Sequence, residues 1–232
     1  MKTIACLLII FLGLDGCKSE SPELKTNANE PTLAAAGDEQ LFTQAAGNLV
    51  TQFRNQLQST LLGAINENGT AYALQICQMR APEIAAAHSV EGWTVKRVSN
   101  QWRSVADKPD STEKAMLERF ADPSTKNDFL VQTAGPDSAR TFQYYEKIMV
   151  KDMCLQCHGD IQTVDQDLWK FIKINYPYDK ATGYKVGDLR GMYVVEAPFP
   201  SGEDVARLLA QGVEVSEISA ATPPPPDSSS AK

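Results

Sequence analysis

Apolar residues recur at three- and four-residue steps along the first third of the chain. They mark one face of residues 42–65, which predicts a long amphipathic helix. Asn68-Gly69 then interrupts the pattern, because this pair favours a turn. A second helical pattern covers residues 70–85, where Pro82 is expected to kink or divide the helix. The chain is therefore predicted to begin its folded part with two consecutive helices.

Strand and helix patterns alternate in the remainder of the chain. Alternation of apolar and polar residues predicts strands at residues 93–98, 129–133, 140–150 and 189–197. Shorter helices are predicted between Pro109 and Pro123, at residues 165–174 and at residues 201–212. Helices followed by a small antiparallel sheet with inserted helices make an α+β fold.

The two ends of the chain lack these patterns. Residues 1–16 have a short charged start and an apolar run too short to cross a bilayer, as in a signal peptide. Residues 17–37 are polar and alanine-rich, which is typical of a flexible tether. Residues 213–232 are rich in proline and serine and are expected to be disordered. The folded part is therefore predicted to be one domain over residues 38–212.

The residues before Cys17 resemble the bacterial lipoprotein cleavage box. In Leu14-Asp15-Gly16-Cys17 an apolar residue stands three positions before the cysteine and a small residue directly before it, while Asp15 departs from the usual pattern. The resemblance implies that Cys17 becomes the lipidated first residue. A plain secretory peptide with an incidental cysteine is the alternative. Lys18 favours the outer membrane, so the expected location is the periplasm-facing cell envelope.

Charge narrows the classes of function. The chain has 232 residues, with 22 Lys and Arg against 29 Asp and Glu, and a formal net charge of −7. An acidic protein without basic runs repels phosphate backbones, so we expect no nucleic-acid partner. Outside the start of the chain no apolar stretch reaches the about 20 residues of a membrane span.

Cys154-Leu155-Gln156-Cys157-His158 is the motif that carries chemistry. Two thiols at this spacing can add to the two vinyl groups of one haem, and the following histidine supplies an axial nitrogen to the iron. Covalent attachment suits an exported protein, because a dissociated haem would be lost outside the cytoplasm. The sequence therefore predicts one haem c, attached through Cys154 and Cys157 and ligated by His158.

Three other uses of the motif compete with haem. A disulfide between Cys154 and Cys157 is compatible with an oxidising compartment. A thioredoxin-like motif should lie between a strand and a helix of a βαβ unit, which the pattern does not show. A zinc site needs further ligands, and only Cys77 and His88 remain for that role.

Cys77 is left over once the other cysteines are assigned, since Cys6 belongs to the expected signal peptide. A thiolate on the second face of the haem would account for it, because iron accepts cysteine as an axial ligand. Cys77 lies on the apolar face of the predicted second helix, where a flat apolar cofactor can pack. A buried, inert cysteine is the alternative. The rival axial ligands are His88, Met79, Met149 and Met153.

Further short strings accompany the motif. They are Ala81-Pro82, Ile84-Ala85, Arg97-Val98-Ser99, Tyr176-Pro177, Asp179, Ala181, Gly183-Tyr184 and Gly187-Asp188-Leu189-Arg190-Gly191. Together with Cys77 they resemble a family of PAS-like, single-haem c-type domains of cyanobacteria and proteobacteria, over about residues 41–200. The resemblance implies a PAS-like antiparallel sheet flanked by helices, with His158 and Cys77 as the two axial ligands.

Two arginines are candidate partners of the haem propionates. Arg97 and Arg103 qualify by charge, because guanidinium groups bind carboxylates well. The chain departs from the family's Arg-Asn-Pro stretch after Arg97. Ordinary surface arginines are the alternative for both.

Two axial ligands leave no open position on the iron, so we expect an electron carrier or redox sensor rather than an enzyme. One alternative is a haem-based sensor in which NO or CO displaces Cys77. The other is a haem peroxidase, for which His88 is the spare histidine. The expected partners are the membrane, through Cys17, and an unidentified periplasmic redox or signalling protein.

Overall fold

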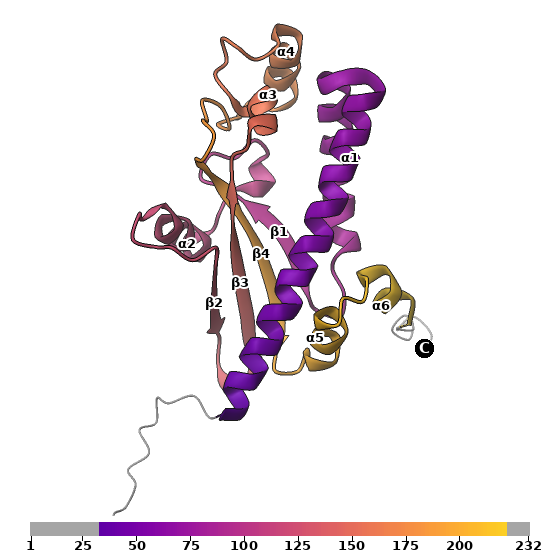
Figure 1. Cartoon of the computed structure of the whole chain (residues 1–232), viewed down its shortest axis with the longest axis vertical. Helices are drawn as coiled ribbons and strands as arrows, with labels where there is room; N and C mark the ends of the chain where they lie inside the picture. Colours follow the sequence, from indigo (N-terminus) through magenta and orange to yellow (C-terminus); the bar gives the residue numbers. More distant parts are fainter. Residues whose placement is uncertain (1–32, 222–232) are drawn as a thin grey trace, which may run out of the picture.

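Four antiparallel strands make the central sheet, in the order β1-β4-β3-β2 (Figure 1). The computed structural model describes residues 33–221. In chain order the elements are α1 (Leu33–Ala87), β1 (Thr94–Val98), η1 (Val105–Asp107), α2 (Ser111–Ala121), β2 (Phe129–Ala134), η2 (Asp137–Ala139), β3 (Arg140–Met149), η3 (Asp152–Cys154), α3 (Leu155–His158), α4 (Gln166–Asn175), β4 (Leu189–Phe199), α5 (Glu203–Ala210) and α6 (Val215–Ala221). No helix within this range is long and apolar enough to cross a membrane. The predicted α+β class is confirmed, whereas the PAS-like character stays a prediction.

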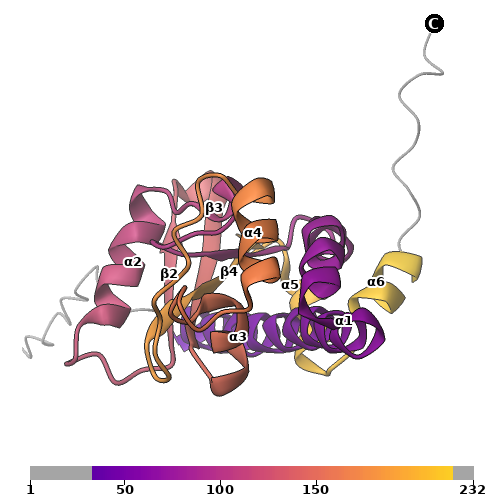
Figure 2. The ribbon, with the colours of Figure 1, turned by 90° about the horizontal axis from the view of Figure 1, so that it is seen from above.

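Alternate residues of the strands serve two separate cores. On one face of the sheet, Val195 packs in the main core with Leu49 of α1 and Leu209 of α5. On the other face, Val194 packs with Leu117 of α2. Successive strand residues point to opposite faces, so these neighbours in β4 stabilise different layers. Figure 2 shows α3 and α4 over one end of the sheet, between α2 and the folded-back part of α1.

The element α1 is a hairpin of two helical arms. Its backbone leaves helical geometry at Asn68 and Gly69, where Gly69 has φ 80° and ψ −176°. The arms lie side by side, because the His88 ring just beyond the second arm packs edge-on against Phe53 of the first, with ring centroids 5.6 Å apart. The predicted interruption at Asn68-Gly69 is therefore confirmed.

Replacing Gly69 by alanine is expected to destabilise the fold. A residue with a Cβ pays about 1–3 kcal/mol in this backbone region, which glycine alone adopts readily. Gly63→Ala is the matched control, since Gly63 is helical and an added Cβ meets nothing within 4 Å. There alanine should raise the free energy of unfolding by about 0.5–1 kcal/mol. Urea denaturation of the two variants measures the difference, and equal effects would contradict this account of the hairpin.

Pro82 lies within the second arm of α1. Helical backbone continues through this residue, so the proline does not divide the arm. Both Pro82 and Gln78 are exposed, so water can hydrate the Gln78 carbonyl, to which proline cannot donate.

Beyond the expected boundary at residue 212, the chain forms α6, whose Val215 and Ile218 are buried in the main core. The folded part therefore extends past that boundary, which is a correction to the predicted start of the tail at residue 213.

Candidate functional site

The cysteine motif forms a tight helical turn just beyond β3. The short helix η3 ends at Cys154, and α3 follows directly and ends at His158. Helical spacing of three residues puts Cys154 and Cys157 on the same side of this turn. Gly159 ends it by donating its N–H to the Leu155 carbonyl at 2.9 Å, and a Cβ at this glycine would collide with that oxygen. Both thiols and the imidazole are therefore grouped within five residues.

His158 is held as one tautomer. Its Nδ1 lies 2.7 Å from the carbonyl oxygen of Ala181, and a carbonyl only accepts, so Nδ1 carries the proton and donates it. Nε2 then keeps its lone pair. Burial, reinforced by the positive charges of Arg190 and Arg103, lowers the pKa of His158 well below its ordinary value. The ring is thus neutral at pH 7, which is the form that coordinates a metal.

The loop after α4 pairs with the turn along its backbone. The N–H of Tyr184 donates to the His158 carbonyl at 3.0 Å, and the N–H of Gly183 donates to the Gly159 carbonyl at 2.8 Å. The Tyr184 ring stands edge-on to the imidazole, with centroids 6.3 Å apart. These contacts fix the imidazole on both its ring and its main-chain side.

Buried Arg103 ties the motif to the same loop. Its Nη2 donates to the Cys157 carbonyl at 2.6 Å and to the Ala181 carbonyl at 3.3 Å. Its Nε donates to the Asp179 carboxylate at 3.3 Å, and this carboxylate also accepts the N–H of Ala181 at 2.9 Å. Arg103 is therefore not a surface arginine. It holds together Cys157 and the residue that orients His158.

The second arm of α1 brings Cys77 to this turn. Leu74, one helical turn earlier, lies in a buried cluster with Leu168 and Ile172 of α4, and Cys157 packs against the same cluster. Cys77 is half-buried and lies near enough to Cys157 to raise the pKa of that thiol. Burial raises the pKa of the Cys77 thiol, and Arg97 opposes that shift. The hairpin thus brings near each other two cysteines that are far apart in the sequence.

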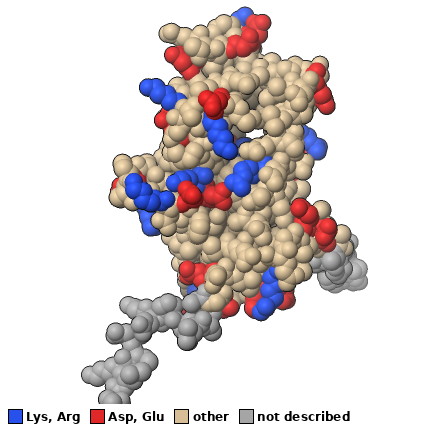
Figure 3. All heavy atoms as spheres, viewed as in Figure 1, with Lys and Arg blue, Asp and Glu red and all other residues tan. Residues whose placement is uncertain are grey.

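Positive charge gathers around the turn. Arg97, Arg103 and Arg190 all act on His158, while Asp107 faces Arg97 and Arg190. Burial raises the pKa of Asp107, and these two arginines oppose the rise. Among the described residues, Arg97 has no hydrogen-bond or ion-pair partner for its guanidinium, and Arg190 donates to the Gln101 carbonyl at 3.2 Å. Figure 3 shows an opening between α1 and this end of the sheet, with basic side chains beside it.

The donor set fits a covalently attached haem. Cys77, Cys154 and Cys157 all carry free thiols, so none is consumed by a disulfide in the structure. Within residues 33–221 no group of three or more His, Cys, Asp and Glu side chains could hold a metal ion, as a closed zinc site requires. The motif also follows an antiparallel strand, outside any βαβ unit. A haem iron needs at most two axial ligands from the protein.

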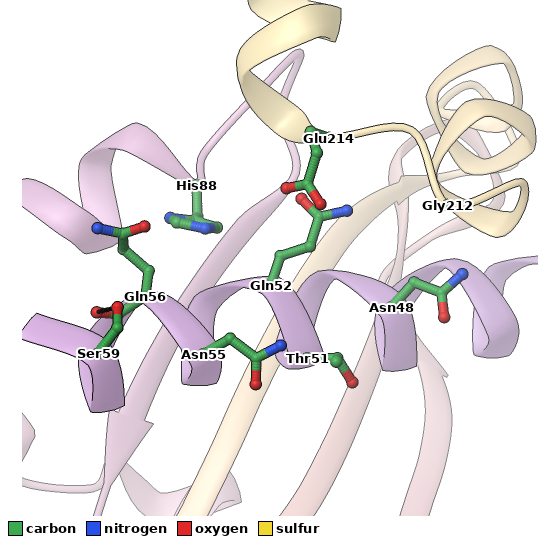
Figure 4. A pocket seen from close by; sticks show the side chains of 9 residues that line it. All are labelled: Asn48, Thr51, Gln52, Asn55, Gln56, Ser59, His88, Gly212 and Glu214. Carbon is green, nitrogen blue, oxygen red and sulfur yellow. Dashed lines mark hydrogen bonds between the residues drawn. The ribbon is translucent and has the colours of Figure 1, made fainter.

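The rival axial ligands lie elsewhere. The Nδ1 of His88 is 2.8 Å from the Ile84 carbonyl, and the ring faces a polar pocket that also includes Gln56 and Glu214 (Figure 4). None of the candidate methionines packs in the buried cluster around Cys157, and their side chains are exposed: Met79, Met149 and Met153. The expected lipidation site Cys17 lies outside the described residues.

Residues 29–198 match the model of the Tll0287-like family. The chain belongs to the Tll0287-like family. A solved structure, described as the crystal structure of the cyanobacterial heme-protein Tll0287, is 30% identical to it, covers 66% of this chain and 94% of that chain, and has a TM-score of 0.48. A search of curated proteins gave no match.

The match to the Tll0287-like family confirms the sequence resemblance at the level of the family. The solved relative is a heme-protein. Covalent attachment, the identity of the axial ligands and the lipid anchor stay predictions. The roles of Arg190, Asp107 and Asp179 were missed by sequence reasoning, although two of them stand in the strings that carry the resemblance. Their function depends on contacts between segments about 75 to 90 residues apart, for which no local pattern exists.

Proposed function

We propose that the chain is an exported c-type haem protein that works in one-electron transfer or redox sensing. When bound, haem supplies an iron that can gain or lose one electron. The observation that carries the proposal is the bond from His158 Nδ1 to the Ala181 carbonyl, inside a Cys-x-x-Cys-His turn with free thiols. Family membership adds independent support, because a heme-protein is among its relatives.

Each residue then has a stated task. Cys154 and Cys157 would attach the cofactor through thioether bonds, and His158 would offer Nε2 to the iron. Cys77 would offer its sulfur from the second arm of α1. Arg97 has no protein partner among the described residues, which supports it as a propionate contact. Arg103 is occupied by Asp179 and two carbonyls, so its proposed task is to hold the turn.

One sulfur ligand and one nitrogen ligand would leave no position on the iron for a substrate. This supports an electron carrier or a sensor over an enzyme. A peroxidase needs an acid–base residue beside an open iron site, and His88 packs against Phe53 in the main core. A lipid at Cys17 and a periplasm-facing position belong to the same proposal, since haem c is attached outside the cytoplasm. A separate redox or signalling protein is the proposed partner.

Replacing Cys77 by alanine is expected to change the iron from six-coordinate to five-coordinate. The ferric wild type, produced with a haem-attachment system, should give a low-spin electron paramagnetic resonance signal with the narrow g-spread of thiolate ligation. Cys77→Ala should convert it to a high-spin signal. Met79→Ala is the matched control, because this exposed side chain lies two residues further along the same arm. A high-spin wild type would contradict the ligand pair.

The reduced protein separates the carrier from the alternative gas sensor. An unchanged six-coordinate optical spectrum after reduction, with no binding of CO, is the result expected for electron transfer. Release of the sulfur on reduction and binding of CO would instead establish the sensor, in which NO or CO displaces Cys77.

A further inference from the structure

A second cationic feature lies on the outer side of the loop that orients His158. The Nζ of Lys180 stands 4.0 Å from the centroid of the Trp102 ring, and the Nζ of Lys108 stands 5.7 Å from it. The N–H of Lys180 also donates to the Trp102 carbonyl at 2.9 Å. Trp102 and Lys108 lie in the connection between β1 and α2, and Lys180 lies in the loop between α4 and β4. The three residues form one surface group, which we call the Trp102 patch.

Both lysines of the Trp102 patch keep their charge available. Each is exposed, and neither forms an ion pair within residues 33–221. The nearby carboxylates are engaged elsewhere: Asp107 faces arginines of the haem site, Asp110 caps α2, and Asp179 is paired with Arg103. The patch is therefore a local positive surface on a chain whose net charge is −7.

The patch also has the composition of a protein interface. Trp102 itself is half-buried, so part of its indole ring faces solvent. Two large apolar side chains next to the patch are exposed, Val105 by 58% and Tyr178 by 70%. Tryptophan and tyrosine side chains are enriched at sites where proteins bind each other.

We infer that the Trp102 patch is the docking surface for an acidic protein partner that exchanges one electron with the haem. This inference rests on the proposed function. Lys180 directly precedes Ala181, whose carbonyl holds His158, so a partner on the patch contacts the loop that orients the proposed iron ligand. The partner's redox centre loses the electron that the iron gains, or gains the one that it loses.

A protein fits the patch better than an anionic membrane does. Lipid-binding sites gather about four to eight lysines and arginines on one surface, whereas the patch has two lysines around an aromatic ring. The loop between α4 and β4, which carries Lys180, also lies in the half of the molecule that carries α3 and α4, away from the first turns of α1 (Figure 1).

The test compares two charge-reversed variants of the full haem-loaded chain. Lys108→Glu/Lys180→Glu reverses the charge of the patch, and Lys114→Glu/Lys126→Glu makes the same change in net charge at exposed positions elsewhere. Oxidation of the reduced protein by anionic hexacyanoferrate(III) should slow about tenfold in the first variant at low ionic strength, and less than about twofold in the control. Equal slowing in both would overturn the patch.

Binding of a ten-residue polyglutamate peptide supplies a readout that needs no electron transfer. The wild type and the control variant should bind it, with affinity that falls as salt rises, and the patch variant should not. Binding to phosphatidylglycerol vesicles without binding to polyglutamate would overturn the choice of a protein partner. The chain could fail to acquire haem when it is produced with the haem-attachment system and still bind polyglutamate through the patch. That result would contradict the proposed function, while the patch would be established as a surface for an acidic partner.

Discussion

Replacing both Cys154 and Cys157 by alanine is expected to abolish covalent haem completely. The two thiols are the attachment points of the proposed thioether bonds, and both are free on one side of the same turn. Haem staining of the denatured chain, together with its intact mass, measures the effect. Each single variant should keep one bond and bind less haem.

Cys77→Ala is the control for this experiment, because Cys77 is proposed to ligate the iron and not to form a covalent bond to the porphyrin. It should keep full haem staining after denaturation while losing the thiolate signal. Haem that stays covalently bound to the Cys154→Ala/Cys157→Ala variant would rule out the proposed attachment.

Removing the Arg103 side chain should produce the largest loss of stability. Arg103→Leu leaves the Asp179 carboxylate without its ion-pair partner and two carbonyls with fewer donors, in a place where the side chains of Arg103 and Asp179 are only 8% and 5% exposed. Leaving one member of a buried pair uncompensated costs about 3–5 kcal/mol. Guanidinium denaturation measures the free energy of unfolding of the variant.

The double variant Arg103→Leu/Asp179→Leu separates charge from packing. Without the orphaned carboxylate, part of the lost stability should return. Arg97→Leu serves as a control on the same site, since Arg97 has no ion-pair partner among the described residues and its loss should change stability by less than about 1 kcal/mol. Equal losses in Arg97→Leu and Arg103→Leu would contradict the role assigned to Arg103.

Periodic segments of the chain could be predicted from sequence because packing and local pattern agree. The break at Asn68-Gly69 was visible, since a glycine there permits the positive φ that the turn needs. The helix α6 was missed because it is short, offers two buried anchors and is followed by prolines. A composition rule that reads proline and serine as disorder therefore began the tail too early.

Part of the candidate site could likewise be predicted from sequence and part could not. The spacing of Cys154, Cys157 and His158 is a local motif that predicts haem attachment, and the structure groups the three residues in one turn. The tautomer of His158 depends on a main-chain carbonyl, Ala181, which no side-chain pattern reveals. The pairing of buried Arg103 with Asp179 likewise joins residues that are remote in sequence, so charge alone could not reveal it.

The first arm of α1 also sets a reach. Between Leu33 and the turn at Asn68 it extends about 50 Å at 1.5 Å per residue, and its first turns lie at the end of the molecule opposite α3 (Figure 1). If Cys17 carries a lipid, as proposed, the anchor lies on the side of the arm's first turns. The length of the arm would then separate the cysteine turn and the Trp102 patch from that anchor, and would favour partners that reach them from the aqueous space.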